Sequence, residues 1–136
     1  MDIAVLQRVL AILRADTAVA SFVGTRIFDN PPHADGVPEV ASPYISLGPH
    51  DTTSDEADCL DIQELNFQVD VWSWGGGESY SRVQAGKIAN AVRDALHRRV
   101  ETVDGSEVEI AHIVTRHQRH DGEINHAVIT MRAFIG

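Results

Sequence analysis

The feature that most constrains this chain is a strict alternation of apolar and polar side chains near its middle. The apolar positions are Leu65, Phe67, Val69 and Val71, and the polar ones between them are Asn66, Gln68 and Asp70. Because successive side chains of a strand point to opposite faces, this period predicts a strand with one buried face. A sheet with one apolar face needs a covering layer, so the rest of the chain has to supply one.

A second alternating segment lies at the C-terminal end, where apolar side chains recur at every other position from Ala127 to Ile135. Before it comes Asp121-Gly122, a strong signal for a tight hairpin turn, and before that an extended segment over 108–120. The sequence therefore predicts a C-terminal antiparallel hairpin. Shorter strands are predicted over 26–30 and 44–48, joined by a proline-containing loop over 31–43.

Three segments have helical periodicity. Residues 2–14 place apolar side chains on one broad face, and a short second helix begins at Asp16 or Thr17, runs to Val23 and ends at Gly24. A third helix is predicted over 79–98, with basic residues at its C-terminal end. Strands outnumber helices and a hairpin closes the chain. We therefore expect an α+β fold with a mostly antiparallel sheet and two main helices packed on one face.

The length of 136 residues is sufficient for one core, so we expect a single domain over 1–136. No apolar run approaches the roughly 20 residues that cross a bilayer, which predicts that the chain has no membrane partner. The single cysteine, Cys59, rules out an intramolecular disulfide and a site built from several cysteines.

The stretch VWSWGGGESY, residues 71–80, raises the question of a phosphate-binding loop. A dinucleotide fingerprint would place a glycine where Tyr80 stands, and a P-loop would need a lysine ahead of Lys87. Glu78 would also repel a phosphate from the start of the following helix. We therefore interpret the glycines as a strand-to-helix corner, with a small-ligand module at Trp72–Tyr80 as the alternative.

The seven histidines invite a metal-site interpretation, above all His117 and His120 near His112 and His126. Side chains three apart on a strand point to opposite faces, which disfavours chelation by His117 and His120. We expect no metal site, no catalytic residue and no cofactor. A hydrolase built on the histidine and acidic clusters is kept as a third hypothesis.

Charge is distributed unevenly along the chain, whose net charge is −9. Acidic residues gather in segment 51–64, at Asp51, Asp55, Glu56, Asp58, Asp61 and Glu64, whereas segment 112–120 is rich in arginine and histidine, including Arg116 and Arg119. Our first interpretation of the acidic segment is an exposed, solvated connection. The second is a contact patch, because a head-to-tail ring needs two unlike, complementary surfaces.

Trp72 and Trp74 are predicted on one strand face, at the positions that alternate with the core. They either cover a second layer or lie in a protein contact, where tryptophan is enriched. The acidic net charge argues against a protein that wraps nucleic acid, because affinity for phosphates comes from lysine and arginine.

Taken together, the motifs resemble a known family, the small tail-completion or tail-terminator proteins of long-tailed phages and phage-derived gene transfer particles. The matching pieces are LQRVLAILRADTAVASFVG, RIFDNPP, SPYISLG, FQVDVWSWGGGESYSRVQAGKIANAVRDAL and HDGEINHAVITMRAFI. They span almost the whole chain in the same order as in the family.

The resemblance implies a non-enzymatic ring of six subunits that caps the tail tube, stops its polymerisation and joins it to the head-side connector. The implied partners are further copies of the chain, the tail-tube protein and a connector or stopper protein, with genome DNA passing through unbound. The implied location is the head-tail junction of a virion or phage-like particle, after synthesis in the host cytoplasm. Candidate subunit-contact or channel-facing residues are Asp55, Glu56, Asp58, Arg116, Arg119, Trp72 and Trp74.

Overall fold

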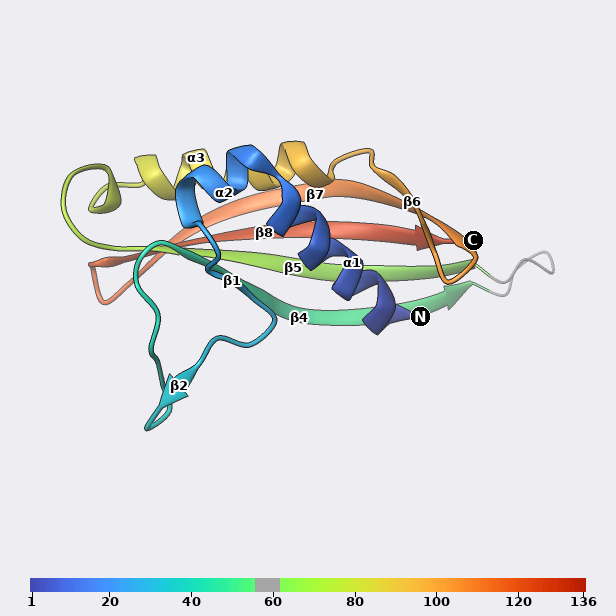
Figure 1. Ribbon diagram of the computed structural model, residues 1–136, viewed down its shortest axis with the longest axis horizontal. Helices are drawn as coiled ribbons and strands as arrows, with labels where there is room; N and C mark the ends of the chain where they lie inside the picture. Colours follow the sequence, from blue (N-terminus) through green and yellow to red (C-terminus); the bar gives the residue numbers. More distant parts are fainter. Residues whose placement is uncertain (56–61) are drawn as a thin grey trace.

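The computed structural model describes residues 1–55 and 62–136, which form a sheet with helices on one face (Figure 1). The helices are α1 (Asp2–Ala15), α2 (Thr17–Val23) and α3 (Val83–Leu96), with a short 3₁₀ turn at Gly77–Ser79. The strands are β1 (Ile27–Phe28), β2 (His33–Ala34), β3 (Val37–Pro38), β4 (Tyr44–Asp55), β5 (Ile62–Ser73), β6 (Val100–Val103), β7 (Ser106–His120) and β8 (Ile124–Ile135).

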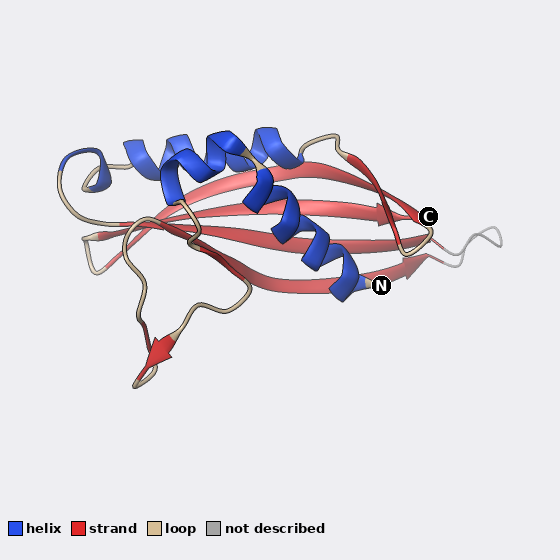
Figure 2. Ribbon diagram, in the orientation of Figure 1, coloured by secondary structure: helices blue, strands red, loops and turns tan. Residues whose placement is uncertain are grey.

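The main sheet has the strand order β1-β4-β5-β8-β7-β6. Strand β1 pairs with β4 in parallel, and every other pairing in this sheet is antiparallel. Strands β2 and β3 form a separate small hairpin that projects away from the main sheet (Figure 2). The expected α+β class and the mostly antiparallel sheet are therefore confirmed.

The helices lie on the face to which the alternating apolar side chains point. Val69 of β5 is paired with Ile129 of β8, and both are fully buried beneath the helices. Helix α1 contributes Val9 and α3 contributes Ile88 to the same core. The 3.6-residue period of the helices and the two-residue period of the strands thus converge on one apolar layer. None of the described helices lies on the opposite face of the sheet (Figure 2), and we call it the open face.

Several predicted boundaries were wrong. Residues 49–55 belong to β4, because the strand continues past an irregularity at Gly48 instead of ending there. The third helix begins at Val83 instead of 79, since residues 77–79 form the 3₁₀ turn. The predicted strand over 26–30 has only two paired residues, Ile27 and Phe28. Strand β6 and the β2–β3 hairpin were not predicted from the sequence.

Candidate functional site

The acidic candidates lie on β4 and in the segment after it. Asp51 is exposed on β4 and accepts a hydrogen bond from Asn66 Nδ2 at 3.0 Å, and Asp55 is the last residue of that strand. Glu56 and Asp58 lie outside the described residues. Glu64, on β5, forms an ion pair with Arg132 of β8. Residues 51–55 and 62–64 of the acidic segment are therefore paired strand, and the interpretation of these residues as a solvated connection was wrong.

The basic candidates lie on β7, at the other side of the sheet. Arg116 is exposed and paired in register with Val128 of β8, which puts its side chain on the open face. Arg119 points to the helix-covered face, where its Nε donates to Asn125 Oδ1 at 3.1 Å. Strands β5 and β8 separate β7 from β4, so the acidic and basic segments lie on opposite edges of the sheet (Figure 1).

The tryptophans belong to an aromatic cluster at the end of the sheet where β4 begins. Tyr44 is the centre of this cluster, with ring centroids 6.2 Å from Trp72, 6.0 Å from Trp74 and 6.4 Å from Phe28. Trp72 also donates from Nε1 to Ser46 Oγ at 3.1 Å. Both tryptophans are half-buried, so they pack against their own chain and also present surface to a partner.

An open pocket of about 520 Å³ adjoins this cluster. Its lining is Val37, Pro38, Tyr44, Trp72, Trp74, Glu123 and Ile124. We call it the aromatic pocket. The ligand-binding alternative was placed at Trp72–Tyr80. Of that stretch, only Trp72 and Trp74 are among the residues that line the aromatic pocket. Its mainly apolar lining can accept an apolar side chain of a partner protein.

A buried polar network lies beneath Trp72 on the otherwise open face. Asp70 is 5% exposed and accepts from His126 Nε2 at 2.8 Å and from Gln68 Nε2 at 2.8 Å. His126 Nδ1 and His120 Nε2 share a hydrogen bond of 2.9 Å, which extends the network to β7. The Trp72 ring stacks on His126 with centroids 3.8 Å apart. Every buried side-chain polar atom in the described part of the chain has a partner, and this network satisfies several of them.

Two neighbouring residues depend on this network. A Cβ added at Gly48 would lie 2.6 Å from Asp70 Oδ2 and 2.7 Å from Gln68 Nε2, so glycine is what lets the strand approach so closely. Burial raises the pKa of the Tyr44 phenol, and the negative charge of Asp70 raises it further. Tyr44 therefore stays neutral across the physiological pH range.

The glycine-rich corner between β5 and α3 is held by side-chain hydrogen bonds from β8, from the end of β5 and from α3 itself. The Nδ2 group of buried Asn125 donates to the carbonyl oxygens of Ser79 at 2.9 Å and of Ser81 at 3.1 Å. Gln84 Oε1 accepts from Ser73 Oγ at 2.7 Å and from Ser79 Oγ. These bonds fix the direction of the chain as it enters α3, which is the role expected of a corner.

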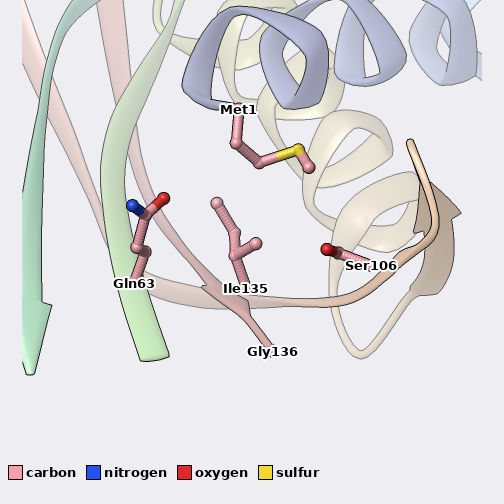
Figure 3. Close-up of a pocket in the computed structure, with 5 residues that line it drawn as sticks. All are labelled: Met1, Gln63, Ser106, Ile135 and Gly136. Atoms are coloured by element: carbon pink, nitrogen blue, oxygen red, sulfur yellow. The ribbon is translucent and has the colours of Figure 1, made fainter. Parts of the chain in front are cut away.

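A cavity of about 300 Å³ lies where the C-terminus meets the start of α1 (Figure 3). Its lining side chains are Met1, Gln63, Ser106, Ile135 and Gly136, a set without an ionisable side chain. Within residues 1–55 and 62–136, no three histidine, cysteine, aspartate or glutamate side chains form a metal-ligand group. None of the helices in the same ranges is long and apolar enough to cross a bilayer.

Comparison with known proteins adds to this geometry. The family model described as "Tail completion protein gp17" matches residues 7–136, which is nearly the whole chain. The chain belongs to this tail completion family. The match confirms the expectation drawn from the motifs and places the protein among structural proteins of phage-type tails, with a role in tail assembly. No curated protein matches the chain.

Solved structures show the same fold. A chain of the "Virion of native gene transfer agent (GTA) particle" is similar, with a TM-score of 0.79 and 24% identity over 93% of this chain and 90% of that one. A second solved chain has a TM-score of 0.62 and 18% identity, covering 96% of this chain and 94% of its own. At these identities the likeness extends to the fold alone.

The Asp70 network was not predicted from the sequence. The available signal was an acidic residue, Asp70, in the middle of the strongest strand pattern and two residues before Trp72, with His126 on the segment that follows the hairpin turn. The predicted geometry of His117 and His120 is confirmed. They lie on opposite faces of β7, since their partners on β8 are Ala127 and Ile124. His120 also hydrogen-bonds His126 of the neighbouring strand.

Proposed function

We propose that the protein forms a head-to-tail ring of six copies that caps the tail tube, ends its polymerisation and joins it to the head-side connector. The observation that carries this proposal is the separation of charge, with exposed Asp51 on one edge of the sheet and exposed Arg116 on the other. A ring built by rotation brings unlike edges of successive copies together, which is the arrangement that opposite charges favour.

The net charge fits a channel through which DNA passes. Six copies, each with a net charge of −9, carry about 54 negative charges, a field that repels a phosphate backbone instead of binding it. The half-buried Trp72 and Trp74 and the aromatic pocket provide a surface for the tail-tube protein or the connector.

Co-assembly with the tail-tube protein tests this function. The masses of the purified protein alone and after mixing with tail-tube protein are measured, and tube lengths are recorded by electron microscopy. We expect tubes of limited length that carry the protein at one end, whether or not the free protein forms rings without a tube. A protein that stays monomeric and leaves tube growth unchanged would contradict the proposal.

A further inference from the structure

The two long edges of the sheet are incompletely paired. On β4, the short strand β1 pairs only with Ile45 and Ser46. On β7, pairing with β6 ends at Glu109, and residues 98–99 then bond to Ile110. Within the described ranges, the outer backbone edges of 47–55 and of 111–120 have no strand partner. His112 N–H is satisfied by His97 Nδ1 at 3.0 Å.

We propose that these two edges pair with each other between successive copies of the chain, so that β7 of one subunit extends the sheet of the next at β4. This inference rests on the proposed ring, which supplies the second copy, and it specifies the joint. Unpaired strand edges are templates for pairing with another chain, and charges on them limit which partner they accept. Here the charges are acidic on one edge and basic on the other.

Strand direction favours this joint. Each of the pairs β4–β5, β5–β8 and β8–β7 is antiparallel, so β4 and β7 run in opposite directions. Rotation about a ring axis leaves the strand direction of every copy unchanged relative to that axis. The new pair is therefore antiparallel, like the long pairs that already make up the sheet.

The charges of the edges define one register. Placing Asp51 opposite Arg116 puts both side chains on the open face, because they are paired in register with Asn66 and Val128, whose side chains lie there. The same register puts His50 opposite His117, and both lie on the helix-covered face, because they are paired in register with Phe67 and Ala127. Pro49 has no N–H to donate, and its position on an edge is one that proline tolerates.

The shift that this register requires agrees with the geometry of a closed barrel. Within one copy, Ser46, Asp70, Val128 and Arg116 form a row straight across the sheet. Moving Arg116 from the level of Ser46 to that of Asp51 is a step of about four residues along β5, from Asp70 to Asn66, because the irregularity at Gly48 adds a residue to β4. This step is roughly 13 Å over four strand spacings of about 4.8 Å. The corresponding strand tilt is about 35°, at the lower end of the range of about 35–45° at which sheets close into barrels.

Disulfide trapping tests the strand pairing. In a Cys59→Ser background, the pair Thr53→Cys and Val114→Cys lies opposite in this register, and directly opposite residues have the Cα separation that a disulfide needs. We expect oxidation of the tube-capping assembly to give covalent chains of up to six subunits. The matched pair Thr53→Cys and Gln118→Cys, four positions away along β7, is expected to give none.

The outcomes separate the joint from the ring. Assemblies that cap tubes but show no disulfide in the opposed pair, or equal disulfides in both pairs, would overturn the strand pairing and leave the ring in place. A protein that never caps tubes would overturn the ring. Normal thermal unfolding of the reduced variants checks that the subunits are folded.

Charge exchange provides a second test. We expect Asp51→Lys to lower the fraction of capped tubes at least tenfold, and Asp51→Lys combined with Arg116→Glu to restore most of it, because the exchanged charges attract again. Asp94→Lys, on the exposed face of α3, is the matched control and is expected to leave capping unchanged. The joint would be refuted if the double variant stayed as defective as Asp51→Lys, or if the control had the same effect.

Discussion

The central strands β5 and β8 differ from β4 and β7, which we call the edge strands because the short strands β1 and β6 cover their outer sides only in part. The difference lies in how many of the strands' backbone hydrogen bonds one chain completes. Both central strands have a partner on each side and residues such as Val69 and Ile129 buried under the helices. The edge strands have long outer edges with exposed Asp51 and Arg116. A single chain therefore completes the backbone hydrogen bonds of its central strands, whereas the outer sides of the edge strands remain available to other copies.

The largest expected effect is a difference in the free energy of unfolding between a substitution in a central strand and one in an edge strand. Ile129→Ala removes buried methyl groups from β8 and leaves a cavity, so we expect the free energy of unfolding to fall by about 2–5 kcal/mol. Val114→Ala, on the exposed side of β7, is expected to cost no more than about 1 kcal/mol. Urea unfolding followed by circular dichroism measures both. Equal losses would erase the distinction between the strands.

The next effect concerns two aspartates on neighbouring strands. Asp70→Ala leaves the donors of His126 and Gln68 without their buried acceptor, and we expect a loss of about 1–3 kcal/mol. Asp51→Ala, on the exposed edge, is expected to change stability by less than about 0.5 kcal/mol. The same unfolding measurement decides between them, and a neutral Asp70→Ala would show that the network adds nothing to the fold.

The smallest effect is a pH dependence on the β7 edge. Burial lowers the pKa of His112, and the positive charges of Arg93 and His97 lower it further. The stability that neutral His112 contributes is thus complete above its unfolded pKa of about 6.5 and is lost as pH falls through its folded pKa.

This contribution is below about 1 kcal/mol because His112 is largely solvent-screened. We expect His112→Gln to lose slightly less stability than the wild type between pH 7.5 and pH 5, as measured by urea unfolding at each pH. A larger loss in the variant would reverse the sign of the effect.

The sequence predicted the centre of the fold better than its edges, for a physical reason. Burial on one face imposes a two-residue period on β5 and β8, and that period is visible in Leu65–Val71 and Ala127–Ile135. An edge strand has less burial to impose such a period. In β4, the irregularity at Gly48 and the polar residues after it therefore resemble a loop in the sequence, and the predicted strand ended there.

The candidate site was predicted in its residue types but not in its arrangement. The positions of charged residues can be read directly from the sequence, so the acidic and basic segments were predicted. Trp72 and Trp74 both line the aromatic pocket. That the two charged segments lie on opposite edges depends on strand order, which no local pattern encodes. The Asp70–His126–His120 network also joins residues far apart in the chain.

Amide hydrogen exchange of the free subunit and of the tube-bound assembly tests most directly whether the unfinished edges are where copies meet. We predict that exchange slows on assembly in residues 47–55 and 111–120, while β5 and β8 exchange slowly in both states. Edges that exchange equally fast in both states, with protection confined to other surfaces, would contradict this conclusion.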